Sequence, residues 1–317
     1  MGSNRRGPSH HAVATFLEVQ GADVVLLSSS VAYWNRRTQD GTWDKHDPKD
    51  AANGADLLEQ GKVRFYSQPT GPLAELRHLV RCLRRARTEL AACKARWRTT
   101  LRPALAPMGE PLPQRLWAEL PPVLQAWERA APGRPAVPKG RLPLGLATAC
   151  ADLGAQVTAV QARIAALEQT LTPVAERLPA YALLRSIPGV GATVAAILLA
   201  EIGDIAWFTK FSQLRKLAGL DIVRVQSGQF AGQARISKCG RPLLRWALYH
   251  AAMGLARTPT GRARLAALKA KRQGDRYAGF KAIVELAAKV LRIVWGVWRS
   301  GTPYDPTRTG GLQRQAR

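Results

Sequence analysis

The sequence predicts a mostly α-helical protein that begins with a small unit of alternating helices and strands. Short apolar runs of strand type occur near the N-terminus, two later segments carry apolar residues at heptad spacing, and the last third shows helical spacing broken by glycine and proline. We expect an α/β unit at 1–70, a coiled-coil arm at 71–178, an all-α domain at 179–302 and a flexible basic tail at 303–317.

Positive charge is the strongest feature of the composition. Lys and Arg number 47 against 22 Asp and Glu, a net charge of +25, while 46% of the residues are hydrophobic. The chain can therefore fold, and its partner should be a polyanion, with nucleic acid first. No apolar run is long enough to span a membrane, and no leader-like stretch follows Met1. The four cysteines lack zinc spacing and fit a reducing compartment, so we expect a cytoplasmic protein.

Residues 1–70 are expected to contain a βαβ unit. The apolar runs 24–27 and 63–66 are of strand type, and the segment 47–60 between them is helical and ends at Gly61. A strand, a crossover helix and a second strand form a right-handed unit. Two strands are too few for a stable sheet, so other elements should complete it.

Two long segments carry apolar residues at alternating steps of three and four. The first seam comprises Leu76, Leu79, Leu83, Ala86, Leu90, Cys93 and Trp97. The second comprises Leu146, Cys150, Leu153, Val157, Val160, Ile164, Leu167 and Leu171, and it should end at Pro173. The connector 103–143 holds ten of the 21 prolines. We expect an arm that is either folded back on itself or paired with another chain as a homo-oligomer.

Asp47 and Asp50 are candidate metal ligands at the start of a helix. Side chains at i and i+3 share a helix face, about 5–6 Å apart at Cβ. Mg²⁺ is commonly held by one or two carboxylates together with phosphate oxygens. The alternative is an ordinary helix start, in which Asp47 is the N-cap, Pro48 the first helical residue and Asp50 a first-turn acid.

Residues 187–193 place Gly189 and Gly191 in a sharp turn before a helix. Free backbone N–H groups at such a turn can hold a DNA phosphate, as in a helix-hairpin-helix. The alternative is a tight interhelical turn whose glycines only permit close packing.

Ser227 precedes Gly228 in a polar segment, and a basic run with Lys238, Arg241 and Arg245 follows. An accessible hydroxyl near cations can attack a phosphodiester, because the cations stabilise the charge that develops. Arg241 and Arg245 oppose the dipole of the helix they begin, which is understandable if a phosphate lies between them. Ser237 competes for the same role.

Taken in order, these motifs resemble the IS-one-ten/Piv class of insertion-sequence transposases, also called DEDD-type transposases. The resemblance rests on 44–51, the proline-interrupted arm, 186–191, 217–220, 226–228, 236–241 and 304–305. It implies a RuvC-like, ribonuclease-H-like domain with four Mg²⁺-binding acids, a coiled coil that assembles the oligomer, and a nucleophilic serine that forms a phosphoserine link with DNA. It also implies a guide RNA as a possible partner.

Carried over by position, the third and fourth acids of the family are Asp47 and Asp50, and the serine is Ser227. The chain departs from the family at its start: the strand with the first acid is absent, and Arg5, Arg6 and Gly7 stand near the expected glutamate. We therefore expect an N-terminally truncated transposase with impaired cleavage. The alternative is a non-catalytic remnant that only binds DNA or RNA.

Overall fold

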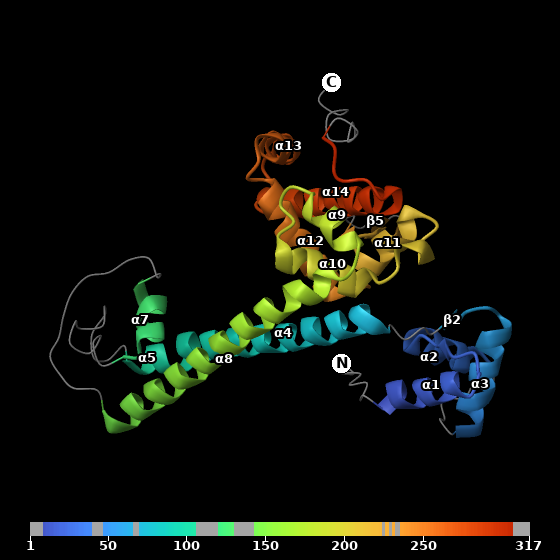
Figure 1. Cartoon of the computed structure of the whole chain (residues 1–317), viewed down its shortest axis with the longest axis horizontal. Coiled ribbons are helices and arrows are strands. Elements are labelled where there is room, and N and C mark those ends of the chain that lie inside the picture. Colours follow the sequence, from blue (N-terminus) through green and yellow to red (C-terminus); the bar gives the residue numbers. More distant parts are fainter. Residues whose placement is uncertain are drawn as a thin grey trace. The chain divides into compact units, whose positions relative to one another are not determined.

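A computed structural model describes residues 9–39, 47–65, 70–105, 120–129, 143–223, 226–227, 230–231 and 235–306. The chain divides into two compact units, Met1–Pro69 and Thr70–Arg317. Helices dominate both, as the sequence predicts (Figure 1). None of the helices that the described residues form is long and apolar enough to cross a membrane.

The first unit contains helices α1 (Ser9–Val19), α2 (Ser29–Gln39) and α3 (Asp47–Glu59) and strands β1 (Val25–Leu26) and β2 (Arg64–Phe65). Val25 pairs with Phe65 in an antiparallel arrangement, so the expected right-handed βαβ unit is wrong. The reason is α2, which the sequence analysis did not anticipate. Each helix in a connection reverses the chain once, and two helices return the second strand antiparallel to the first.

Helix α3 packs against α2 through a small polar network and one buried leucine. The Asn35 side-chain amide donates to Asn53 Oδ1 at 2.9 Å, and the Asn53 amide donates to the Ala32 carbonyl at 2.8 Å. Leu57 is fully buried. Gly61 adopts a φ of 64°, so α3 ends where the sequence predicts.

The second unit begins with an arm made of α4 (Gly71–Arg96) and α8 (Leu144–Glu176), which lie side by side within one chain (Figure 1). Every residue of the two predicted seams is buried or half-buried. The predicted end at Pro173 is wrong, because α8 continues to Glu176. Val174 and Ala175 are buried in the core, and their packing stabilises the last turn despite the missing proline N–H.

Short elements close the far end of the arm. After α4 the chain forms a π-helical stretch (Trp97–Leu101) and α5 (Arg102–Leu105), and α7 (Pro122–Arg129) packs beside α8. A second core joins these elements to the arm. Its buried residues are Cys93, Trp97, Leu101, Leu105, Leu120, Leu124, Cys150, Leu153 and Val157.

The remaining helices surround the other end of the arm. They are α9 (Ala180–Arg185), α10 (Ala192–Ile202), a 3-10 turn η3 (Ile205–Trp207), α11 (Phe211–Ala218), α12 (Pro242–Leu255), α13 (Pro259–Ala270) and α14 (Ala278–Ser300). One core joins Leu76, Val80 and Leu171 of the arm to α10, α12 and α14. The arm and this helical region therefore form one unit. Of the tail, residues 303–306 are described, and the Tyr304 N–H donates to Ser186 Oγ.

The segment between α11 and α12 contains two nested antiparallel strand pairs, although the sequence analysis expected a polar loop. Strands β3 (Ile222–Val223) and β6 (Arg235–Ile236) pair at its base. Strands β4 (Gln226–Ser227) and β5 (Phe230–Ala231) pair further out along the chain. We call the segment 221–236 the serine hairpin.

Candidate functional site

Ser227 lies at the last paired position of the serine hairpin. Its backbone pairs with Phe230, and Gln226 pairs with Ala231, so only residues 228 and 229 separate the two strands. Residues 228 and 229 and the Ser227 side chain are outside the described part of the chain. The backbone register alone therefore places the candidate nucleophile next to the tip of the hairpin, away from its base.

The base of the serine hairpin is fixed to the C-terminal end of α11. The Ser237 N–H donates to the Asp221 carbonyl at 2.7 Å, and the Arg241 N–H donates to the Leu217 carbonyl at 2.7 Å. A Cβ on Gly240 would lie 2.4 Å from the nitrogen of Gly219, so no side chain fits there. Ser237, the rival nucleophile, is thus at the fixed base of the hairpin.

Lys238, also at the base, has a φ of 54°, which is unusual for a residue other than glycine. Its N–H donates to the Gly219 carbonyl at 3.1 Å, and its side chain is exposed. This backbone contact offsets part of the strain and leaves the ammonium group in solvent next to the hairpin.

Arg241 and Arg245 have structural partners that the sequence analysis did not foresee. The Arg245 guanidinium donates to the Ala218 carbonyl at 3.0 Å, at the end of α11. The Arg241 guanidinium donates to the Glu201 carbonyl, near the end of α10. Both cations satisfy carbonyl groups that a helix C-terminus leaves without intrahelical partners. Their position therefore does not require a phosphate between them.

Gly189 and Gly191 differ in their surroundings. Gly189 has a φ of 89°, and a Cβ there would lie 2.3 Å from the Leu255 nitrogen and 2.5 Å from the Ala251 carbonyl oxygen. Its Cα also faces Gly254 of α12. Gly189 is therefore explained by close packing. Gly191 is the exposed N-cap of α10, and a Cβ there would meet nothing within 4 Å. Gly191 alone keeps the geometry of a backbone anion site.

Asp47 and Asp50 begin α3, as predicted, but they do not make a metal site together with the other described residues. Asp50 Oδ1 forms an ion pair with the Arg36 guanidinium at 2.6 Å, and Asp47 is exposed. Arg36 competes with any cation for Asp50. No group of three His, Cys, Asp or Glu side chains gathers anywhere in the described ranges, and Asp44 and His46 lie outside them. Within the described ranges these two acids alone do not form a magnesium site.

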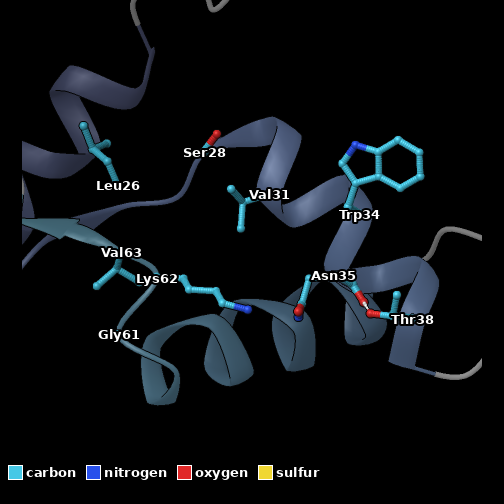
Figure 2. Close-up of a pocket in the computed structure, with 9 residues that line it drawn as sticks. All are labelled: Leu26, Ser28, Val31, Trp34, Asn35, Thr38, Gly61, Lys62 and Val63. Carbon is cyan, nitrogen blue, oxygen red and sulfur yellow. Dashed lines mark hydrogen bonds between the residues drawn. The ribbon is translucent and has the colours of Figure 1, made fainter. Parts of the chain in front are cut away.

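A hollow in the first unit lies apart from these two acids. It has a volume of about 670 Å³ and opens between α2, the end of α3 and β1, as Figure 2 shows. Its lining residues are Leu26, Ser28, Val31, Trp34, Asn35, Thr38, Gly61, Lys62 and Val63. Neither Asp47 nor Asp50 is among them, so the hollow and the predicted carboxylate pair are separate features.

A cluster of aromatic rings on α12 was not predicted as functional. Trp246, Tyr249 and His250 are spaced i, i+3 and i+4, which is a signal for one helix face. None of the three rings was among the predicted site residues. Burial lowers the pKa of the His250 imidazole, and the Arg87 guanidinium lowers this pKa further.

Residues 181–266 match the model of a family described as the transposase IS116/IS110/IS902 family. This stretch runs from α9 into α13 and contains the whole serine hairpin. Residues 181–266 therefore resemble the transposase domain of this family, and we call them the matched domain. The predicted resemblance to the IS-one-ten class is confirmed. Gly189, Gly191, Ser227, Lys238, Arg241 and Arg245 all fall inside the domain, whereas Asp47 and Asp50 lie outside it.

Curated proteins of insertion sequences are similar to the same chain. The insertion element IS110 uncharacterized 43.6 kDa protein of Streptomyces coelicolor is 27% identical over 52% of this chain and 40% of its own length. The transposase for insertion sequence element IS1111A of Coxiella burnetii is 33% identical over 41% of this chain and 36% of its own. The insertion element IS900 uncharacterized 42 kDa protein of Mycobacterium paratuberculosis is 28% identical over 51% and 40%. The matched region thus spans about two fifths of these relatives.

Proposed function

We propose that this chain is a DNA transposase that cuts and rejoins DNA through the hydroxyl of Ser227. The observation that carries the proposal is the place of Ser227 inside the matched domain, at the last paired position of a hairpin with a fixed base. A nucleophile near the tip of a protruding hairpin can contact the backbone of a DNA molecule that lies outside the protein surface. Because the base of the hairpin is fixed, the serine hydroxyl is confined to a small range of positions.

The chemistry follows from the serine. The Ser227 oxygen attacks the phosphorus in line, a serine–phosphate bond forms, and the bond from phosphorus to one DNA oxygen breaks. The proton of the serine hydroxyl passes to a general base, and the DNA oxygen that leaves takes up a proton. Rejoining is the reverse step, in which a DNA hydroxyl attacks the phosphoserine. The number of bonds to phosphorus is conserved, so no external energy source is needed.

Basic side chains at the base of the serine hairpin offer contacts to the DNA backbone. Lys238 lies exposed at the base of the serine hairpin. Arg241 and Arg245 donate to carbonyl groups close by and keep their positive charge. Fixed cations at the base attract the DNA phosphates on either side of the one that Ser227 attacks. The exposed N-terminus of α10 at Gly191 offers backbone N–H groups to a neighbouring phosphate.

Magnesium enters the proposal through the family resemblance alone, with Asp47 and Asp50 as candidate ligands. Because Arg36 pairs with Asp50 and no third ligand joins them in the described ranges, we assign no step to the ion. A Mg²⁺ titration of DNA cleavage addresses the point. If Asp47→Asn and Asp50→Asn leave the magnesium requirement unchanged, these acids are helix-start residues only.

Cleavage of a supercoiled plasmid or a four-way DNA junction tests the serine. The unmodified chain should produce a covalent protein–DNA adduct that survives denaturing electrophoresis, and Ser227→Ala should abolish it. Ser237→Ala is the matched control, since this serine lies nearby at the fixed base. An adduct that persists in Ser227→Ala and disappears in Ser237→Ala would assign the nucleophile to Ser237 and reject the role of Ser227.

The second candidate function is a non-catalytic protein that holds DNA or RNA. The ion pair between Arg36 and Asp50 favours it, because it gives one predicted metal ligand a structural role. Binding of DNA by the unmodified chain without cleavage under any divalent metal supports this alternative. Both candidate functions are compatible with a guide RNA as a partner. Its requirement is tested by adding total RNA of the host to the cleavage reaction.

Assembly into a homo-oligomer through the arm is also proposed. The seams of α4 and α8 face each other within one chain, so a second copy has to contact the outer faces of these helices. Analytical ultracentrifugation of the full chain measures the oligomeric state. A dimer that remains intact after charge reversal on the outer arm would place the interface elsewhere.

A further inference from the structure

A row of exposed aromatic rings crosses from α12 to the beginning of α14. The ring centroids of Trp246 and His250 are 4.1 Å apart, those of His250 and Tyr249 5.9 Å, and those of Tyr249 and Phe280 5.9 Å. Tyr277 lies at the N-cap of α14. We call these five residues, Trp246, Tyr249, His250, Tyr277 and Phe280, the aromatic strip. All five belong to the second unit.

Most of the aromatic strip is open to solvent, and Tyr249 is half-buried. Phe280 is 60% exposed, Tyr277 58% and Trp246 37%. Single exposed apolar residues are common on proteins, but neighbouring exposed rings of this size indicate a contact surface. The imidazole of His250 is the fifth ring of the strip, and its centroid lies 4.1 Å from that of Trp246.

The charge beside the aromatic strip is positive. The Arg87 guanidinium from α4 lies 5.1 Å from the Trp246 ring centroid, and the Arg276 guanidinium lies 5.7 Å from that of Tyr277. The neighbouring acids already have partners, because Glu168 pairs with Arg87 and Asp275 pairs with Lys281. Residues 235–317 carry 18 Lys and Arg against three acids.

We propose that the aromatic strip binds the unpaired bases of a single DNA strand. Base faces stack on the rings, and the arginines attract the phosphates between the bases. Arg276 brings positive charge to the ring of Tyr277. Arg87 keeps N–H donors beyond its ion pair with Glu168 within reach of the Trp246 ring. Flat ring faces with positive charge beside them are complementary to a polyanion with flat bases, and a duplex hides the base faces. The choice of DNA rests on the proposed function, since cutting and rejoining DNA requires strands that separate and pair anew.

Binding measured in EDTA tests the aromatic strip without any cleavage step. Fluorescence anisotropy compares a single DNA strand of about 15 nucleotides with the matching duplex. Phe280→Ala and the double variant Tyr277→Ala with Phe280→Ala should weaken single-strand binding about tenfold and duplex binding less than twofold. Because both residues are exposed, their replacement should leave the thermal unfolding midpoint unchanged. A failure of catalysis by Ser227 has no effect on this result.

Trp207→Ala is the matched control. Trp207 is 56% exposed in η3, which packs near the opposite end of α14. This variant should bind single strands like the parent. Equal losses in Trp207→Ala and Phe280→Ala would overturn the proposal, because the effect would then not be local to the aromatic strip. Equal losses for single strand and duplex, or no loss at all, would overturn it as well.

Two conservative substitutions separate stacking from general apolar contact. Phe280→Trp keeps a flat ring and should retain single-strand binding, whereas Phe280→Leu keeps an apolar side chain and should lose it. Full retention by Phe280→Leu would contradict stacking. The last comparison uses a single RNA strand of the same length. If it binds more than tenfold tighter than DNA and is the ligand lost in Phe280→Ala, the assignment to DNA is wrong.

Discussion

Gly189 and Gly191 are two residues apart in one turn, yet they have opposite surroundings. Gly189 is pressed against the backbone of α12 in a left-handed conformation, while Gly191 faces open space. The sequence predicted the turn but left packing and phosphate binding as alternatives, because the partner helix is about 60 residues away in sequence. Local spacing does not report which distant backbone approaches a glycine.

Gly189→Ala should lower the free energy of unfolding by about 2–4 kcal/mol. The new Cβ would lie 2.3 Å from the Leu255 nitrogen, and the φ of 89° is unfavourable for alanine. Gly191→Ser is the control, because serine is a good N-cap and its Cβ meets nothing within 4 Å. Urea denaturation of both variants measures the difference. A cost for Gly191→Ser as large as that for Gly189→Ala would contradict this account.

His250 should make the stability of the protein depend on pH. Burial and then Arg87 lower its pKa from the usual value of 6.5. The unfolded chain therefore takes up a proton at a higher pH than the folded chain, and stability falls as pH decreases from about 6.5 towards the folded value. Above the usual pKa this loss is absent.

Replacing His250 with phenylalanine should remove this part of the pH dependence. The free energy of unfolding, measured between about pH 5 and pH 7.5, should then fall less steeply in His250→Phe than in the parent. Identical slopes in the two proteins would show that His250 has the same pKa in the folded and unfolded states.

At the scale of elements, the arm depends on its buried seam more than on its charged pairs. Two ion pairs join the helices of the arm: Arg163 of α8 pairs with Glu89 of α4, and Arg177, directly after α8, pairs with Glu75 of α4. In each pair both side chains are about half exposed. Exposed ion pairs contribute roughly 0–1 kcal/mol, whereas a buried leucine contributes several times more. The heptad pattern was therefore sufficient to predict which faces meet.

Leu153→Ala should destabilise the second unit by about 2–5 kcal/mol, because Leu153 is fully buried between α8 and the elements at the end of the arm. Glu89→Gln removes an ion pair with Arg163 and should cost less than about 1 kcal/mol. Thermal or urea unfolding of both variants gives the comparison. A larger loss of stability in Glu89→Gln than in Leu153→Ala would mean that charge, and not packing, holds α4 and α8 together.

Three elements show where sequence reasoning stopped. Helix α13 begins after Thr258, whose side chain accepts a hydrogen bond from the Gly261 N–H at 3.1 Å. The helix was not predicted, because Pro259 and Gly261 in its first turn are residues that usually indicate a loop. The serine hairpin has strands of two residues, too short for an alternating pattern. Helix α2 has few apolar residues, and missing it reversed the predicted strand direction. In each case tertiary contacts decide the structure, and the local pattern is weak.

The candidate site was predicted in part. The motifs predicted the resemblance to the transposase family, because the spacing of chemical groups along the chain is visible in the sequence. The role of Ser227 stays a prediction. The partners of Asp50, Arg241 and Arg245 were not predicted, since Arg36 and the helix-end carbonyls are brought to them only by folding. The aromatic strip was missed for the same reason, as α4, α12 and α14 each contribute to it.

At the scale of the whole molecule, the net charge of +25 should dominate DNA affinity. Each phosphate that the protein neutralises releases counterions, so a footprint of about 6–10 phosphates would weaken binding by about 10³–10⁵-fold between 50 and 200 mM salt. Fluorescence anisotropy with duplex DNA over this range measures the slope. A nearly flat dependence would show that most of the positive charge lies away from the DNA.

The contact between Gly189 and Gly254 has a consequence for genetics. Helix α12 has 14 residues and is about 21 Å long. Gly254 lies near its C-terminal end, and the fixed base of the serine hairpin precedes its N-terminal end. A substitution that pushes Gly254 away from Gly189 would shift the helix that follows the base of the serine hairpin. Small substitutions at Gly254 are thus good starting points for temperature-sensitive variants that fold in the cold and unfold with warming.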